Sequence, residues 1–467
     1  MKNKIFTTLE KFNYLNYLAY FTILLIFWFY YLDIAKAYQF PINDELGYLD
    51  EGIHLRNVSY DFREIYNRNR TPFLPLVISF ISLNKSSLSQ SSLTGAPLHS
   101  SYSAEYLDLF RSSQIAIILI TLFLTFLIAK QLEKFFKSKV TVIFYIFYLL
   151  YIPVTLHIKE VLIEPIFMLL YLYFILILFE VKDSSSTKDF IKFGIISGVL
   201  FLSKYTGFII FLFTWLTLLM YRYFYKKEIK INISLKQILV SFFILCIIGS
   251  PYIIANISDG LNPFYSVNSK ILWYSSWPEA YQIIEQYDGN HGFKNIPDDL
   301  KPGISYYINN NTLSDTIDRI NLGVGNLKND YTNPFDLAGK TSILLFCLII
   351  LITLNIILTS RNEVINILKK NIYEILFIIA ISLSLIAGYI LYSPISNSPR
   401  FHLYITLPIV FLFTFFLDRF SFLECKKIYI RNILNLTSVF LFTYVNLIFI
   451  NTYLFYERVI GFVKSLF

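Results

Sequence analysis

The stretch that decides the fold lies at residues 41–75 and reads PINDELGYLDEGIHLRNVSYDFREIYNRNRTPFLP. It follows the first long apolar segment and holds a dense cluster of charges, formed by Asp44, Glu45, Asp50, Glu51, His54, Arg56, Asp61, Arg63, Glu64, Arg68 and Arg70. Most of the remaining chain is apolar. A chain that is mostly apolar yet concentrates so many charges in one stretch predicts a polar active-site loop held by membrane helices.

The composition indicates a membrane protein. Hydrophobic residues make up 55% of the chain and charged residues only 15%, whereas soluble domains carry about 25% charged residues. Many apolar runs approach the ~20 residues that a membrane-spanning helix needs. We therefore expect an all-α polytopic membrane protein. Basic loops between membrane spans explain the net charge of +8, which does not indicate a nucleic-acid partner.

The chain has three cysteines. Cys246 and Cys347 lie in apolar segments and Cys425 lies in a basic loop, so we expect no disulfide framework. No cysteine or histidine pattern has the spacing of metal ligands. The first apolar segment lacks a small-residue cleavage site and is interpreted as a retained span.

The apolar runs predict about eleven spans, at approximately 14–35, 107–129, 140–157, 161–181, 190–203, 206–224, 237–256, 341–360, 372–393, 402–417 and 432–454. Basic residues are distributed unequally between the loops. Alternate loops carry three to five each, whereas the short loops between them carry only Lys159, Lys204 or Arg400. Because basic loops stay on the cytoplasmic side, we expect a cytoplasmic N-terminus and an external C-terminus.

This topology divides the chain into three parts. Residues 1–256 form an N-terminal transmembrane module with a long first external loop at 36–106, residues 257–340 form an external cap, and residues 341–467 form the C-terminal transmembrane helices. Within the first loop, Phe73–Leu83 is apolar but too short to span a membrane, which predicts a juxtamembrane helix in the interface. Residues 85–103 are rich in serine and predict a flexible loop.

Asp44 and Glu45 stand where a short helix is expected to begin. One interpretation is helix capping, since acidic side chains satisfy the free N–H groups of the first turn. The other is general base catalysis, in which a carboxylate takes a proton from an acceptor hydroxyl. A second carboxylate beside it would tune the first one or position the acceptor.

A second pair of carboxylates occurs in the sequence HIKEVLIEPIF. Glu160 and Glu164 are four residues apart, a spacing that would place both on one face of a helix. Acidic residues at the mouth of an apolar hairpin are candidates for function. The alternative is ordinary solvation of a loop beside Lys159.

Several external cations lie near predicted membrane surfaces: Arg68, Arg70, Lys159, Lys204 and Arg400. Lys204 follows an apolar run so short that the lysine would lie near membrane depth. Arginine and lysine bind phosphate well, so several of them converging would hold a lipid phosphate and stabilise it as a leaving group. The alternative for each is an anchor among lipid headgroups.

The order of these features resembles the GT-C fold glycosyltransferases. The resemblance is strongest to the polyprenyl-phosphate-sugar-dependent branch that includes the protein O-mannosyltransferases and the lipid A aminoarabinose transferase. It covers approximately residues 15–417. The matching motifs are DELGY at 44–48, RTPFLP at 70–75, EVLIEP at 160–165, GIISGVLFLSKYTG at 194–207, SPY at 250–252, NPFY at 262–265 and PRFH at 399–402.

The resemblance implies a GT-C fold that transfers a sugar from a polyprenyl-phosphate carrier to a glycan, lipid or protein acceptor, with inversion. Asp44 would be the general base, Glu45 its support, and Glu160 or Glu164 a second carboxylate in the same cleft. The carrier phosphate would be bound by Arg68, Arg70, Lys204, Arg400 and His402. No obligatory metal is implied, although some relatives bind a divalent cation. The site would face outward from a bacterial cytoplasmic membrane, or lie in the lumen of a eukaryotic endoplasmic reticulum.

Other classes of membrane protein remain open from the residues alone. A polysaccharide polymerase or ligase would place its site late in the chain, as in 257–340. A transporter would need ionisable groups at the bilayer midplane and usually internal repeats. A non-catalytic scaffold would need neither. Substitution of Asp44 separates the first-loop transferase from all three.

Overall fold

The computed structural model describes the following residues: 2–38, 41, 44–62, 71–84, 102–155, 157–182, 184, 186–225, 234–258, 261–265, 270, 272–287, 296–332, 349–350, 353, 361–394 and 400–421. Secondary structure in these ranges is helical, and no strand occurs among them. The expectation of an all-α protein is confirmed for this part of the chain.

Five of the described helices are long and apolar enough to cross a membrane. They comprise most of α1 (Lys2–Ala37), from Tyr17 onward, and α4 (Ala104–Phe135), α6 (Glu164–Val181), α9 (Leu235–Ser258) and α16 (Ile372–Tyr392). This agrees with a helical membrane protein. The side of the membrane on which each loop lies stays a prediction.

Three further helices cover other expected spans. α7 (Thr187–Ser203), α8 (Thr206–Tyr225) and α17 (Arg400–Ser421) lie where three spans were predicted. The span expected at 140–157 is not one regular helix, because α5 (Lys139–Leu149) passes into a π-helical turn over Leu150–Val154. Pro153 within that turn cannot donate a backbone hydrogen bond. The expected span 341–360 lies mostly outside the described residues, and the expected span 432–454 lies wholly outside them.

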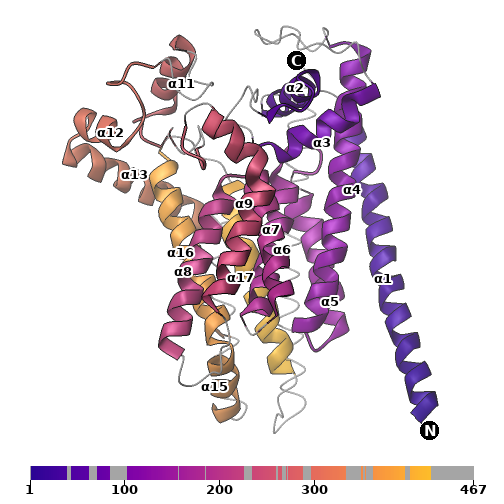
Figure 1. The fold of residues 1–467 in the computed structure, drawn as a ribbon. Helices are drawn as coiled ribbons and strands as arrows, with labels where there is room; N and C mark the ends of the chain where they lie inside the picture. Colours follow the sequence, from indigo (N-terminus) through magenta and orange to yellow (C-terminus); the bar gives the residue numbers. More distant parts are fainter. Residues whose placement is uncertain are drawn as a thin grey trace. The chain divides into compact units, whose positions relative to one another are not determined.

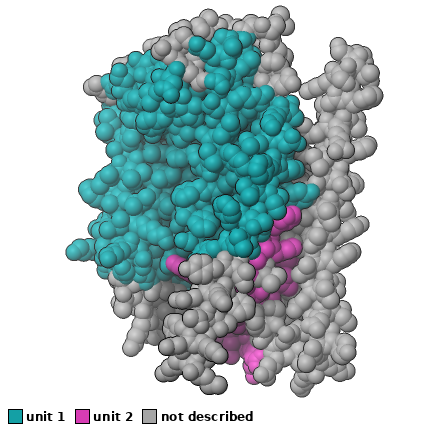
Figure 2. Space-filling model, turned by 90° about the vertical axis from the view of Figure 1, so that its right-hand side faces the viewer, with its two compact units in different colours: residues 1–131, 149–312 teal, residues 132–148, 313–467 magenta. Residues whose placement is uncertain are grey.

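The chain forms two compact units (Figure 2). Unit 1 comprises residues 1–131 and 149–312, and unit 2 comprises residues 132–148 and 313–467. The predicted cap segment 257–340 is therefore shared between the units. A short segment at the junction of α4 and α5 belongs with the C-terminal half of the chain.

In unit 1, α6 is surrounded by other parts of the chain. The share of its residues buried is 94%, and the sequence IFMLLYLYFILILF following Pro165 is apolar on every face. A helix that is hydrophobic all round is a core helix. Figure 1 shows α6, α7 and α9 running side by side.

Small residues bring α7 and α9 together. A Cβ atom on Gly194 would lie 2.6 Å from the Ser241 carbonyl oxygen, and one on Gly198 would lie 2.5 Å from Ile248 Cβ. Such close approach of two backbones requires residues without a side chain, as in other helix pairs of membrane proteins.

Two short helices follow α1. α2 (Asp44–Asn57) begins at Asp44, as expected, and α3 (Phe73–Ile81) confirms the predicted helix over the apolar run. A Cβ atom on Gly52 would lie 2.5 Å from Ile78 Cγ2, so the two helices pack very closely. Arg56 Nη1 also donates to the Ser82 carbonyl, at 2.8 Å. The location of α3 in a membrane interface stays a prediction.

Residues 272–312 of unit 1 contain two more helices, where the sequence suggested no assignment. α11 (Trp277–Gln286) begins at an N-cap, Ser276, whose side chain accepts from the Glu279 N–H. α12 (Ile304–Asn310) follows. Tyr306 donates its hydroxyl hydrogen bond to Glu279 Oε1 at 2.5 Å, which joins the two helices.

Unit 2 contains α13 (Leu313–Thr332), α15 (Arg361–Lys370), α16 and α17. The buried Asp418 of α17 accepts from the Lys137 and Ser138 N–H groups, at 2.7 and 3.0 Å. These N–H groups lie just before α5, where a helix start leaves backbone donors unsatisfied. Asp418 therefore fixes the turn between α4 and α5 to α17.

Candidate functional site

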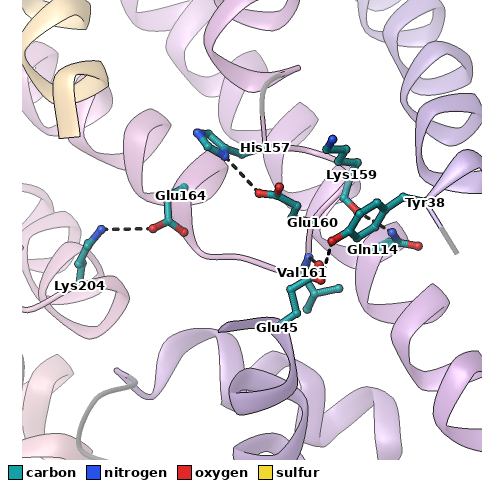
Figure 3. Close-up of polar contacts among 9 residues, drawn as sticks. All are labelled: Tyr38, Glu45, Gln114, His157, Lys159, Glu160, Val161, Glu164 and Lys204. Atoms are coloured by element: carbon teal, nitrogen blue, oxygen red, sulfur yellow. Dashed lines mark hydrogen bonds and ion pairs between the residues drawn. The ribbon is translucent and has the colours of Figure 1, made fainter. Parts of the chain in front are cut away.

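The beginning of α2 is held by Glu45. Its side chain is only 1% exposed. Oε1 accepts a hydrogen bond from the Val161 N–H at 2.7 Å, and Oε2 accepts one from the Tyr38 hydroxyl at 3.0 Å. Figure 3 shows these contacts. Asp44, the first residue of the helix, is half-buried. Glu45 thus fixes the position at which Asp44 is presented.

The second pair of carboxylates does not share a helix face, and this part of the interpretation is wrong. α6 begins only at Glu164, with Pro165 in its first turn, a position that proline favours because its missing N–H is not needed there. Glu160 lies in the preceding turn and contacts His157, with 3.2 Å between Oε2 and Nδ1. The two carboxylates therefore have different partners.

Glu164 pairs with Lys204. The Lys204 Nζ lies 3.4 Å from Glu164 Oε1 and 5.8 Å from the centre of the Phe167 ring. α7 ends at Ser203, and Lys204 has an extended backbone that stops the helix. The glutamate is buried, whereas the lysine side chain is 25% exposed. Lys204 is thus held by an acidic partner while part of its side chain remains accessible.

Thr71 is hydrogen-bonded to the end of α7, next to Lys204. The buried Thr71 hydroxyl donates to the Ser203 carbonyl at 2.6 Å, immediately before Lys204. Thr71 directly follows Arg70 and is three residues after Arg68, and both arginines lie outside the described residues. The resemblance places these arginines near the carrier phosphate, and Thr71 brings the end of their segment to the end of α7.

Arg111 and Gln114 of α4 support the site and were not singled out from the sequence. Arg111 Nη1 donates to the Ala35 and Tyr38 carbonyls, both at 2.6 Å, and to Gln114 Oε1 at 2.9 Å. Gln114 Nε2 donates to the Lys159 carbonyl at 2.5 Å. The sequence did offer a signal for Arg111, because it lies in the expected span 107–129 and a charge within a membrane span needs a partner.

Tyr38 connects these contacts. Its carbonyl accepts from Arg111, its hydroxyl donates to Glu45, and Lys159 Nζ lies 5.6 Å from the centre of its ring. One residue, Tyr38, therefore connects the end of α1 to α2, to α4 and to the turn before α6.

Asp50 was noticed only as one charge of the cluster, and it has a distinct environment. It accepts a hydrogen bond from the Tyr106 hydroxyl at 3.2 Å. Burial raises the pKa of Asp50 to about 6, although the hydrogen bond from Tyr106 opposes this shift. Burial raises the pKa of Tyr102, and the nearby charges of Asp50 and Glu45 raise it further. The pKa of Asp50 therefore lies well above that of an ordinary aspartate.

The two remaining predicted phosphate-binding residues belong to unit 2. Arg400 and His402 lie in the first turn of α17, in unit 2, and their side chains are outside the described residues. Convergence of these side chains with Lys204 stays a prediction. Among the described residues, no group of three or more His, Cys, Asp or Glu side chains could hold a metal ion.

The described site therefore combines a half-buried aspartate at a helix start, a buried glutamate that anchors it, a His–Glu pair and a Lys–Glu pair. In the view of Figure 3 the His157–Glu160 pair is drawn between the other two groups of contacts. This set can accept a proton and can bind an anion. No family model, curated protein or solved structure matches this chain.

Proposed function

We propose that this protein is an integral membrane glycosyltransferase that moves a sugar from a polyprenyl-phosphate carrier to a hydroxyl-bearing glycan, lipid or protein. One observation carries the proposal: the Glu45–Val161 hydrogen bond joins the helix that begins with Asp44 to the turn leading into Glu164 and its partner Lys204. A base and a cation are thereby supported by one framework of apolar helices. The order of motifs that resembles GT-C glycosyltransferases supports the same function.

Asp44 is the general base. Its carboxylate takes the proton of the acceptor hydroxyl while the acceptor oxygen attacks the anomeric carbon. The bond from that carbon to the phosphate oxygen breaks, and the polyprenyl phosphate leaves with the electron pair. Attack from the side opposite the leaving group inverts the anomeric configuration. At the first position of a helix the dipole favours the ionised form, so the carboxylate is free of its own proton before the acceptor arrives.

Glu45 positions the base and does not itself take the proton. Both of its oxygens accept hydrogen bonds from fixed donors, and its side chain is buried. A carboxylate in this position holds α2 against the turn at 157–163. Loss of Glu45 therefore displaces Asp44, and small displacements of a catalytic group are costly to the rate.

Lys204 binds the carrier phosphate, and Glu164 keeps the lysine in place before the donor arrives. A lysine ammonium supplies a compact positive charge for a phosphate oxygen. Stabilising the departing phosphate lowers the barrier for breaking the sugar–phosphate bond. Glu160, with His157, lies in the intervening turn and is available to contact sugar hydroxyls.

The test is transfer of label from a panel of radioactive polyprenyl-phosphate sugars in membranes that carry wild type, Asp44→Asn or Glu105→Gln. Asp44→Asn preserves size and removes the base, so transfer should fall by about 100-fold or more, with donor binding retained. Glu105 is an exposed carboxylate in the first turn of α4. Its substitution should leave transfer unchanged.

The outcomes separate the alternatives. Unchanged transfer in Asp44→Asn would place the base elsewhere, at Glu160 or in the segment 257–340. Absence of transfer by wild type with every donor would overturn the glycosyltransferase proposal and favour a polymerase or a transporter. Equal losses in Asp44→Asn and Glu105→Gln would show a general effect of charge removal.

A further inference from the structure

α13 carries a stripe of apolar side chains that the described residues leave exposed. Leu313, Ile317, Ile320 and Val324 are 78%, 48%, 39% and 45% exposed. Their spacing of four, three and four residues places them on one face of a helix. Scattered apolar residues on a surface are ordinary, whereas a continuous exposed stripe marks an interaction surface.

The adjacent side of α13 packs against the last turn of α16, within unit 2. Arg319 Nη2 donates to the Leu391 carbonyl at 2.9 Å, and Asn326 Nδ2 donates to Ser393 Oγ at 3.4 Å. Asp330 accepts from the Tyr389 hydroxyl. A Cβ atom on Gly323 would lie 2.0 Å from the Ile390 carbonyl oxygen, so the helices approach very closely at that glycine.

These contacts show that α13 crosses α16 steeply. From Arg319 to Asp330 the contacts cover about 16 Å of α13, but from Tyr389 to Ser393 they cover only about 6 Å of α16. Two helices that ran alongside each other would match in length. α13 therefore lies across the end of α16, and Figure 1 draws it beside that end.

The end of α16 is where a membrane surface is expected. α16 is a candidate span of 21 residues ending at Tyr392, long enough for about 30 Å of hydrocarbon. Leu376, Ile379, Leu383 and Leu391 are large apolar residues exposed on this span. A span with exposed leucines and isoleucines meets lipid there, and Leu391 extends this lipid-facing surface to the helix that crosses it.

We propose that α13 lies in the plane of the bilayer surface, with the stripe Leu313–Ile317–Ile320–Val324 inserted among the lipid headgroups and upper acyl chains. Helices with one apolar face bind membranes in this way. Asp315, Asp318, Arg319, Lys328 and Asp330 give α13 a net charge of −1, counting two basic and three acidic residues. Burial of the stripe, and not attraction to anionic lipids, therefore drives the contact. This inference does not depend on the glycosyltransferase activity.

Spin labels at single cysteines test the proposal. The full chain, with Cys246, Cys347 and Cys425 replaced by serine, is reconstituted in phosphatidylcholine nanodiscs. It carries Ile320→Cys, Val324→Cys or the matched control Leu322→Cys. Leu322 is also an exposed apolar residue (55%), but it lies on the opposite side of the helix from Ile320. Thermal unfolding of each labelled variant is compared with the cysteine-free parent.

We expect the ratio of collision with oxygen to collision with a water-soluble nickel chelate to be several-fold higher at positions 320 and 324 than at 322. Equal ratios at the three positions would overturn the proposal, because the stripe would then be no closer to lipid than the opposite side of the helix. Low collision with both reagents at 320 and 324 would also overturn it, since the stripe would be covered by protein or by a second copy of the chain.

Discussion

At the residue scale, Glu45 illustrates how one buried carboxylate connects separate parts of the chain. Its two oxygens connect the residue after α1, the start of α2 and the turn before α6. Hydrogen bonds to a buried charged group contribute roughly 1.5–3 kcal/mol each. Glu45 therefore matters to stability whether or not a substrate is bound.

We expect Glu45→Ala to lower the free energy of unfolding by about 2–3 kcal/mol, because the Val161 N–H loses its acceptor in a buried position. Tyr38→Phe removes one hydrogen bond and should cost about 1 kcal/mol. Thermal unfolding in detergent measures both. If Tyr38→Phe lowered the free energy of unfolding as much as Glu45→Ala, the hydrogen bond from Val161 would not be the larger contribution of Glu45 to stability.

The Lys204–Glu164 pair gives a second prediction. Lys204→Gln removes the cation from the buried Glu164 and should lower stability by about 1–3 kcal/mol. The double variant Lys204→Gln/Glu164→Gln should recover most of that stability, because no carboxylate then lies buried without its lysine.

The same two variants separate binding from folding. If Lys204 binds the carrier phosphate, both should raise the KM for the donor by about tenfold or more. The measurement is thermal unfolding in parallel with donor titration. Recovery of donor affinity together with stability in the double variant would contradict the phosphate role of Lys204.

Asp50 gives a prediction in pH. Its folded-state pKa is raised to about 6 from 3.8, so ionising it costs stability. This cost is fully present above pH 6 and disappears as the pH falls towards 4. Asp50→Asn should be more stable than wild type at pH 7.5, and the advantage should shrink as the pH falls through 6. Unfolding temperatures of both proteins between pH 4.5 and 7.5 measure this; a constant difference would contradict it.

At the element scale, the α7–α9 pair depends on close backbone approach. Gly194→Ala would place a methyl group 2.6 Å from the Ser241 carbonyl oxygen, which forces the helices apart. We expect a loss of stability of about 1–3 kcal/mol. Gly388 in α16 is the matched control, since a Cβ atom there meets nothing within 4 Å. Gly388→Ala should be neutral or stabilising by up to about 1 kcal/mol.

Thermal unfolding of the two glycine variants decides this prediction. Equal effects would mean that the α7–α9 contact tolerates a wider separation of the helices. A larger loss in Gly388→Ala would show that α16 is the more tightly packed helix at its glycine.

The positions of helices were readable from the sequence, but their exact starts were less so. Hydropathy placed α1, α4, α6, α9 and α16 because length and apolar content are local properties. The interpretation that Glu160 and Glu164 share a helix face failed because α6 begins only at Glu164, so Glu160 lies in the turn before it. Pro165 was the missed signal, as proline stands in the first turn of a helix.

At the scale of the whole molecule, the division into two units could not be read from composition. Residues 132–148 join unit 2 through partners more than 250 residues away, such as Asp418. The candidate site could likewise be predicted only in part. The start of α2 at Asp44 follows from local sequence, whereas the hydrogen bond between Glu45 and Val161 joins residues 116 positions apart. Local patterns predict elements, and contacts distant in sequence set their arrangement.

This division predicts the behaviour of a split chain. Residues 313–467 expressed alone lack the segment 132–148, so Lys137 and Ser138 are not there for Asp418 to bind. We expect this fragment to be degraded when expressed alone and to be protected when co-expressed with residues 1–312. Pull-down of a tagged fragment measures the recovery.

A variant links the split-chain result to one contact. Asp418→Ala in the fragment 313–467 should lower its recovery with residues 1–312, because two backbone donors of the α4–α5 turn lose their acceptor. Full protection of 313–467 in the absence of the N-terminal fragment would contradict this account of unit 2.

The burial of α6 has a consequence for how the protein is made. α6 leaves the ribosome before α7 and α9, yet in the finished structure 94% of its residues are enclosed. The newly inserted helix therefore first meets lipid and later exchanges that lipid for protein neighbours. Since lipid tails and leucine side chains are equally apolar, the exchange is driven by fit between side chains. Changes in side-chain volume along α6 consequently act on assembly, even where they leave hydropathy unaltered.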